Sequence, residues 1–87
     1  MSKKINLEER KLKAIELFQM GREARLRNKP EEAVRCIREA MLLNDECGSH
    51  REYTRCINLL GITYADIGNE SMAVDCYLDG LEYAHLY

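Results

Sequence analysis

The 87-residue sequence is poor in the features that mark several classes of protein. It has no tryptophan, one proline and five glycines that stand apart from one another. Low-complexity chains and glycine-rich phosphate-binding loops are therefore excluded. No stretch approaches the ~18 consecutive apolar residues of a membrane span, so we expect no membrane partner. With 46% hydrophobic and 32% charged residues, the composition is that of one small folded domain.

The N-terminus and the cysteines indicate a reducing compartment. Lys3 and Lys4 are not followed by an apolar run, so the start of the chain lacks the pattern of a secretory signal peptide. Three of the four cysteines, Cys36, Cys56 and Cys76, lie within amphipathic helical patterns. We therefore predict a cytoplasmic protein whose thiols are reduced and largely buried.

The formal net charge is only −2, but the charges are unevenly distributed. Residues 1–29 carry nine Lys or Arg against four Asp or Glu, whereas residues 30–87 carry four against eleven. A chain with this dipolar pattern could steer a charged partner or favour head-to-tail contact. A solvated basic helix ahead of acidic ones is the simpler explanation, and the sequence leaves both open.

Helical patterns cover the chain, and no segment alternates with the period of a strand. Two capping pairs mark helix starts: Asn6 with Glu9, and Ser49 with Glu52. Gly68 is expected to end a helix in the left-handed conformation. The predicted helices span about residues 6–28, 30–45, 49–68 and 69–86.

The sequence repeats itself at a shift of 40 residues. The identical pairs are Gly21 and Gly61, Ala33 and Ala73, Val34 and Val74, and Cys36 and Cys76. They fall at equivalent places in two predicted helix pairs, so we expect a duplicated helical hairpin. The prediction is a single all-α domain over residues 1–87, with repeats at about 6–46 and 49–87.

Two glycines, Gly21 and Gly61, lie in the middle of predicted helices, where glycine costs about 1 kcal/mol relative to alanine. Close approach of the second helix of each pair would offset that cost. The facing small residues are predicted to be Ala33 and Ala40 in the first pair and Ala73 and Gly80 in the second. Ile37 and Tyr77 are expected to fill the space beside them. The packed stripes of the first helices are predicted to contain Leu17, Met20, Gly21 and Ala24, and Ile57, Leu60, Gly61 and Tyr64.

Together these positions resemble the tetratricopeptide repeat (TPR) family. Its pattern is a large residue, Leu-Gly three and four residues later, a tyrosine three beyond, and Ala-x3-Phe-x2-Ala on the second helix. The signature positions of this chain are Gly21, Ala33, Ala40, Gly61, Tyr64, Ala73, Tyr77 and Gly80. The resemblance implies a right-handed α-α superhelix, a TPR-like solenoid of two antiparallel hairpins. The 40-residue period, against about 34 in the family, and the missing closing proline leave the superhelical pitch open.

The resemblance also implies where a partner binds, because the first helix of each hairpin lines the concave face of such arrays. The side chains predicted on that face are Ile15, Phe18, Gln19, Arg22, Arg25, Leu26, Arg55, Asn58, Leu59, Ile62 and Asp66. They form either a peptide-binding surface or, for the apolar members, core between the repeats with surface arginines around it. A clamp for a peptide's terminal carboxylate is not supported, because Phe18 and Leu59 stand where its polar residues are expected.

The fourth predicted helix has no cover. Stable solenoids usually need about three repeats and a polar terminal cap. Either a second chain covers the side of this helix that carries Tyr77, Leu81, Tyr83 and Tyr87, or the sequence is a fragment of a longer array or protein. We expect the fragment.

The sequence contains no convincing catalytic, metal or cofactor site. Cys47 and His50 have the spacing of metal ligands, but no second pair stands a loop away. No local signature supports a Cys–His nucleophile. An isoelectric point near 5.7 and the lack of interleaved basic and aromatic residues argue against nucleic acid. We predict a protein without enzymatic activity, cofactor or metal.

The leading functional hypothesis is a scaffold or adaptor that binds a protein or peptide. The alternative is the N-terminal regulatory module of a bacterial signalling enzyme, because residues 59–73 resemble repeats that precede diguanylate cyclase (GGDEF) domains in some bacteria. The catalytic domain would then lie beyond Tyr87. A self-associating structural module is the third possibility.

Overall fold

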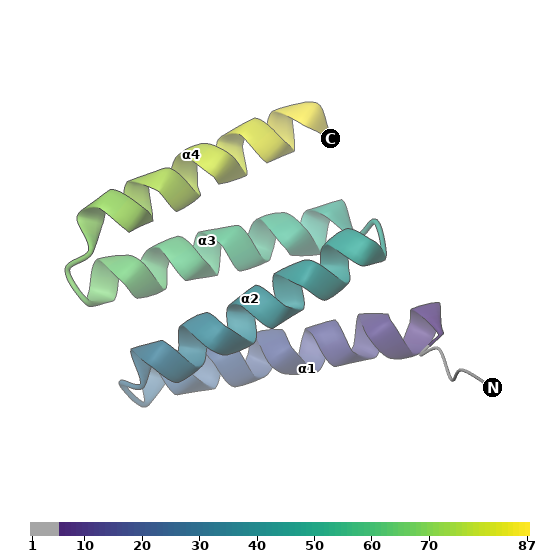
Figure 1. Cartoon of the computed structure of the whole chain (residues 1–87), viewed down its shortest axis with the longest axis horizontal. Helices are drawn as coiled ribbons and strands as arrows, with labels where there is room; N and C mark the ends of the chain where they lie inside the picture. Colours follow the sequence, from purple (N-terminus) through teal and green to yellow (C-terminus); the bar gives the residue numbers. More distant parts are fainter. Residues whose placement is uncertain (1–5) are drawn as a thin grey trace.

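The computed structural model describes residues 6–87, and over that range the chain forms four α-helices and no strand (Figure 1). α1 spans Leu7–Leu26, α2 Pro30–Glu46, α3 His50–Asp66 and α4 Glu70–Leu86. The predicted all-α class is confirmed, and the helix ends lie within about two residues of those predicted. None of these helices is both long enough and apolar enough to cross a membrane. Lys3 and Lys4, on which the signal-peptide interpretation rests, lie outside the described residues.

The helix bounds repeat at the predicted shift. α4 begins and ends 40 residues after α2, and α1 and α3 end 40 residues apart. Asn28 and Gly68, which are separated by the same shift, have φ angles of 61° and 77°. Both hairpins therefore turn through a left-handed residue, and the predicted conformation of Gly68 is confirmed.

The two predicted helix caps have different outcomes. The Asn6 side chain accepts a hydrogen bond from the Glu9 backbone N–H at 2.8 Å and donates one to the Glu9 carboxylate, as predicted. The second capping box is wrong, because the Ser49 side chain makes no hydrogen bond to the start of α3. The backbone angle does not explain this, because Asn69 has nearly the same ψ angle (74° against 77°) and its side chain accepts a hydrogen bond from the Met72 backbone N–H. The asparagine oxygen stands one bond farther from the backbone than the serine hydroxyl, and at this ψ angle only the longer side chain caps the helix.

The helices lie in two layers. In the view of Figure 1, α1 and α3 lie behind α2 and α4, and each helix runs antiparallel to the one before it. α2 packs on both α1 and α3, whereas α4 packs on α3 alone among the described helices. The resulting molecule measures 46 × 32 × 17 Å.

Both mid-helix glycines lie beneath a large side chain of the neighbouring helix. A Cβ atom on Gly21 would stand 2.7 Å from Cγ1 of Ile37, and one on Gly61 would stand 2.6 Å from Cε1 of Tyr77. Only glycine allows so close an approach, which explains the helix-weakening residue at both places. The predicted partners need a correction, since the nearest side chains are Ile37 and Tyr77. The small residues are buried beside them: Ala33, Ala40, Ala73 and Gly80.

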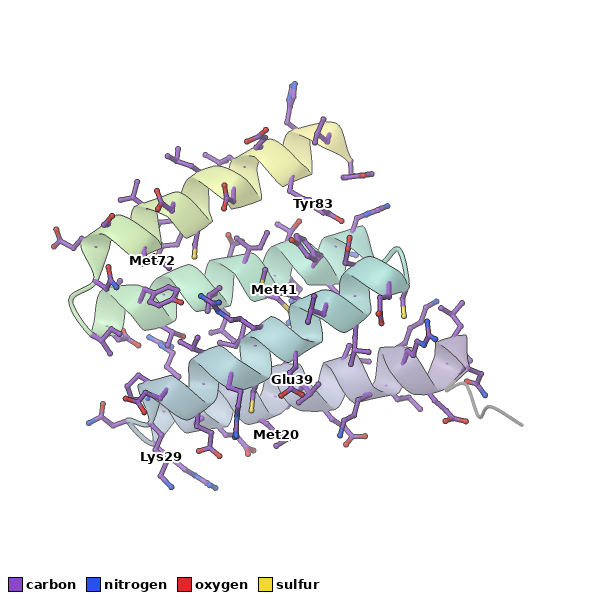
Figure 2. All side chains as sticks on the ribbon, viewed as in Figure 1. Met20, Lys29, Glu39, Met41, Met72 and Tyr83 are labelled. Atoms are coloured by element: carbon purple, nitrogen blue, oxygen red, sulfur yellow. The ribbon has the colours of Figure 1, made fainter. Side chains whose placement is uncertain are left out.

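The core continues from one hairpin to the next through α3. Leu60 is only 6% exposed, because α2 covers its side of α3. The equivalent prediction for Met20 is wrong, because that side chain is 47% exposed. No described helix lies on the corresponding side of α1. On the matching side of α3, by contrast, α2 is present, and its Met41 lies between the two helices (Figure 2). The two repeats therefore share a sequence pattern but not an environment.

The polar side chains of the core are satisfied. Thr63 Oγ1 donates a hydrogen bond to the Leu59 carbonyl at 2.8 Å. Asn44 Nδ2 donates to Cys56 Sγ at 3.5 Å, which joins α2 to α3. Since a buried polar group without a partner is costly, the bond between Asn44 and Cys56 favours this alignment of α2 and α3.

Four rings fasten the end of α4 to the start of α3. Tyr83 Oη lies 2.7 Å from His50 Nδ1, and the Tyr83 ring centroid lies 4.3 Å from that of Tyr53. The Tyr87 ring stacks on His50 at 3.9 Å. Figure 2 shows Tyr83 pointing from α4 toward α3. Tyr83 therefore belongs to the seam between these helices, and the prediction that it shares an uncovered side with Leu81 is wrong. Tyr87 stacks on His50 but is 70% exposed, as is Leu81, so both are largely uncovered by the described helices.

Candidate functional site

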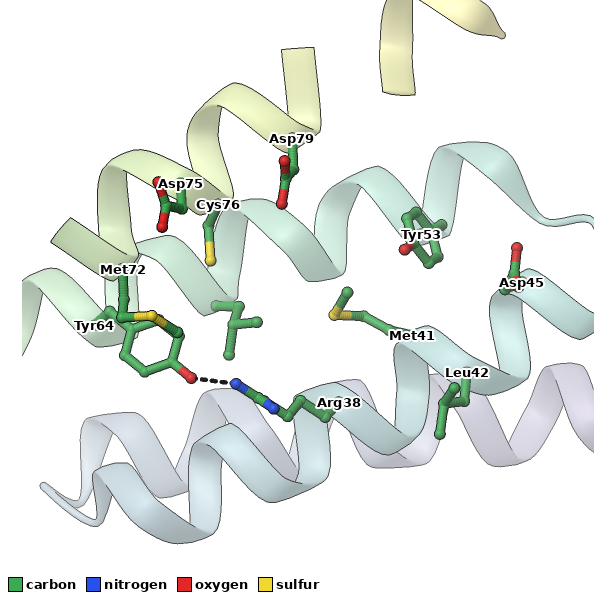
Figure 3. A pocket seen from close by; sticks show the side chains of 11 residues that line it. Arg38, Met41, Leu42, Asp45, Tyr53, Tyr64, Met72, Asp75, Cys76 and Asp79 are labelled. Carbon is green, nitrogen blue, oxygen red and sulfur yellow. Dashed lines mark hydrogen bonds between the residues drawn. The ribbon is translucent and has the colours of Figure 1, made fainter. Parts of the chain in front are cut away.

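A groove lies between α2 and α4, with α3 at its bottom (Figure 3). Its larger part has a volume of about 520 Å³, and a smaller part of about 310 Å³ continues toward the C-terminal end of α4. Both parts are lined by Met41, Tyr53, Leu60, Cys76 and Asp79, so they form one depression, here named the inter-hairpin groove. The groove exists because α4 packs on α3 without reaching α2.

The floor of the inter-hairpin groove is apolar and is built from three helices. Met41 comes from α2, Leu60 from α3 and Met72 from α4, and all three pack in the core cluster. Tyr64 forms one end, where Arg38 Nη2 donates a hydrogen bond to Tyr64 Oη at 2.6 Å (Figure 3). Methionine side chains are flexible and polarizable, so a floor that contains two of them can adapt to different apolar groups.

The rim of the groove is acidic. Asp45 from α2 and Asp75 and Asp79 from α4 line the larger part, and Glu82 lines the smaller one. Arg38 is the one positively charged residue among those that line the two parts. The groove therefore carries an excess of negative charge beside an apolar floor.

Two side chains inside the groove respond to this charge. The pKa of Tyr53 is raised, mainly by burial and then by the negative charges of Asp45 and Asp79. The pKa of Cys76 is also raised, first by burial and then by Asp79. Negative charge disfavours ionisation of a neighbouring phenol or thiol. The negative potential of the rim carboxylates therefore extends to the side chains inside the groove.

The residues predicted to bind a partner lie on α1 and α3, in the layer opposite the groove. Two pairs of them contact each other. The Arg55 guanidinium lies 4.9 Å from the centroid of the Phe18 ring, and Arg25 Nε lies 2.5 Å from Asp66 Oδ2. The hydrogen bond from Arg25 to Asp66 raises the pKa of Arg25. These contacts join α1 to α3, so part of the predicted surface holds the two hairpins together.

The other predicted residues divide by burial. Leu59 is 8% exposed and belongs to the core. The exposed ones are Ile15, Gln19, Arg22, Leu26, Asn58 and Ile62. Together with the two contacting pairs, they define the leading-helix face. Its role in binding a peptide stays a prediction.

Within residues 6–87, no group of three or more His, Cys, Asp and Glu is arranged to hold a metal ion. The four cysteines are free thiols, and the predicted burial of Cys36, Cys56 and Cys76 is confirmed. Burial raises the pKa of Cys56 to about 11, so this thiol stays protonated at neutral pH. A protonated, enclosed thiol is a poor nucleophile.

We expect the free energy of unfolding to fall as the pH rises from 9 to 11. Cys56 ionises near pH 9.0 in the unfolded chain but near 11 in the folded one. Between these values the unfolded state loses its proton first and is favoured, by roughly 2 kcal/mol at the upper end. Urea unfolding at several pH values should show a shallower decline for Cys56→Ala than for the wild type. Parallel declines would contradict this assignment.

Reasoning from the sequence missed the inter-hairpin groove. Part of its signal was present, because Asp75, Asp79 and Glu82 recur at helical spacing on one side of α4. The groove itself depends on the separation of α2 from α4, which is set by how both pack on α3. A 40-residue sequence repeat does not specify that distance.

Comparison of the chain with models of known protein families, with curated proteins and with solved structures gives no match. The function therefore has to be inferred from the geometry of the chain itself.

Proposed function

We propose that the chain is a protein-interaction module that binds a segment of a partner protein in the inter-hairpin groove. The observation that carries the proposal is an apolar floor bordered by the carboxylates of Asp45, Asp75, Asp79 and Glu82. The matching ligand is a peptide with Lys or Arg next to large apolar side chains. The apolar side chains supply most of the affinity, and the charges supply specificity and speed of association.

The architecture that we propose for this module is TPR-like, with two stacked hairpins at the start of a right-handed α-α superhelix. The shared 40-residue spacing of the helices and the two nested glycines support it. Stacked hairpins expose extended surfaces, and proteins of this kind act by binding. We accordingly propose a scaffold or adaptor without enzymatic activity of its own.

The groove is favoured over the leading-helix face for two reasons. Arg25 and Arg55 on that face already contact Asp66 and Phe18, so a peptide would have to compete with them. The groove, by contrast, offers a continuous apolar floor between two walls. The leading-helix face, through Arg22 and its exposed neighbours, is the second surface to test.

A displayed library of random peptides of about 12 residues tests the proposal directly. We expect the selected peptides to place Lys or Arg beside Leu, Met, Phe or Tyr. The double variant Asp75→Lys with Asp79→Lys should bind synthetic versions of them at least about tenfold more weakly, because it reverses the charge of one wall. Both residues are exposed, so the variant is expected to fold.

The matched control is the double variant Arg22→Glu with Asn58→Ala, on the opposite layer. It should bind the selected peptides as the wild type does. Loss of binding in this variant alone would move the site to the leading-helix face. A library that yields no basic, apolar consensus would refute the groove as a binding site.

A further inference from the structure

The outer side of α4 has an apolar surface that no other described helix covers. Val74, Leu78 and Leu81 are 52%, 58% and 70% exposed. Next to them, between α3 and α4, lies a hollow of about 400 Å³. Its lining consists of Thr54, Asn58, Tyr77, Gly80, Leu81 and Ala84. The stripe formed by Val74, Leu78 and Leu81, together with this hollow, is here named the C-terminal socket.

The residues of α2 that stand 40 positions before the stripe face α3. Arg38, the equivalent of Leu78, donates its hydrogen bond to Tyr64 of α3. Val34, the equivalent of Val74, lines a small cavity with Tyr64 and Ile67. The same helix surface is thus an interface in the first hairpin and is open in the second.

The hollow shows the same difference. The residues 40 positions before its lining are Ala14, Phe18, Ile37, Ala40, Met41 and Asn44. Ile37 is fully buried there and Asn44 is 5% exposed, with its amide bonded to Cys56 of α3. Tyr77, the equivalent of Ile37, is 38% exposed. In the first hairpin this hollow is filled by a helix, and the structure itself therefore supplies a template for what fills the second.

We infer that the C-terminal socket is a docking site for an amphipathic helix of a partner protein, antiparallel to α4 as α3 is to α2. The α3 pattern defines the helix that fits, with a small residue at the place of Cys56 and large apolar residues at those of Leu60 and Tyr64. Leu78 stands where α2 has Arg38, which hydrogen-bonds the Tyr64 hydroxyl. The residue of the docked helix that takes the place of Tyr64 therefore needs an apolar side chain but no hydroxyl group. Asp75 and Glu82 border the stripe, so the docked helix carries Lys or Arg along that edge.

A second copy of the chain does not fit this socket. In a head-to-tail assembly, α1 of the next copy would dock, and it has Glu16, Gln19 and Glu23 where α3 has Cys56, Leu59 and Thr63. Two carboxylates would then be buried beside the acidic edge of α4. Antiparallel pairing of two α4 helices would bring the acidic edges of both copies together, which is also unfavourable.

The socket and the inter-hairpin groove share Asp75 and Glu82 at their border, but Val74, Leu78 and Leu81 line neither part of the groove. A substitution at Leu78 therefore tests the socket alone. We would titrate the 15N-labelled full chain with a synthetic peptide of residues 49–67, the sequence of α3, in a reducing buffer. Backbone amide shifts should concentrate on Val74, Leu78 and Leu81 as the peptide approaches about 2 mM. The variant Leu78→Lys, at an exposed position, should weaken binding at least about tenfold.

The matched control is a peptide of residues 9–27, the equivalent part of α1, which should cause no shifts on α4. Equal binding of both peptides would overturn the inference, as would the absence of shifts on α4 with the first. Light scattering completes the test. A wild-type dimer that Leu78→Lys converts to a monomer would show that a second copy occupies the socket and would also overturn the inference. Leu78→Lys should leave the binding of peptides selected for the groove unchanged, because Leu78 lines neither part of it. The two proposals can thus fail separately.

Discussion

Replacement of Ile37 by alanine should lower the free energy of unfolding by about 3 kcal/mol. Ile37 is fully buried, and its Cγ1 atom fills the space that Gly21 leaves open. Its loss would create a cavity between α1 and α2 in addition to removing apolar contacts. Urea unfolding followed by circular dichroism measures the change.

The repeat and the glycine provide two controls for this variant. Tyr77→Ala removes the equivalent side chain of the second hairpin, but Tyr77 is 38% exposed, so the loss should be clearly smaller. Gly21→Ala should be neutral or harmful in the wild type and stabilising in the Ile37→Ala background. There its Cβ atom fills part of the cavity and the helix gains about 1 kcal/mol of propensity. Additive effects of the two substitutions would contradict the contact between Gly21 and Ile37.

Replacement of Leu60 by lysine should unfold the domain or cost about 4 kcal/mol. Leu60 is 6% exposed between α2 and α3, so the substitution removes its packing in the core and places a charge on the apolar floor of the groove, below the rim carboxylates. A chain of this size buries little surplus apolar surface, so a loss of this magnitude approaches its whole stability. The measurement is the same urea unfolding series.

Met20→Lys is the matched control, because Met20 occupies the equivalent position in the sequence pattern. It is 47% exposed, so the substitution should change the free energy of unfolding by no more than about 0.5 kcal/mol. Similar costs at both positions would mean that Met20 is covered in solution, most simply by another chain on that side of α1.

Much of the fold could be predicted because local chemistry specifies it. Asn6 and Glu9 cap α1 as predicted, and α2 begins at Pro30, the first residue of the predicted range 30–45. The paired glycines predicted the close crossing of each hairpin, although the residues above them are Ile37 and Tyr77. Ser49 shows the limit, since its hydroxyl makes no capping bond although Asn69, at nearly the same ψ angle, caps α4. A sequence pattern does not specify the backbone angle at which the longer side chain is needed.

The candidate site could be predicted less well, because it depends on distances between helices. Helical periodicity places Arg25 and Arg55 on one face. It does not show that Arg25 already forms an ion pair with Asp66, or that Arg55 already lies over the Phe18 ring. Periodicity also assigns Met20 and Leu60 the same role, although only Leu60 has a helix beside it. Such differences arise from the order of stacking, which a repeated pattern leaves unspecified.

The packing order of the helices has a consequence for how the chain folds. α2 packs on α1, α3 on α2 and α4 on α3, and each connection between them is only three residues long. Contacts between neighbours in the sequence require the closure of short loops alone, so little chain entropy is lost before the first contacts form. Folding can therefore begin in either hairpin and spread along the molecule from one helix to the next.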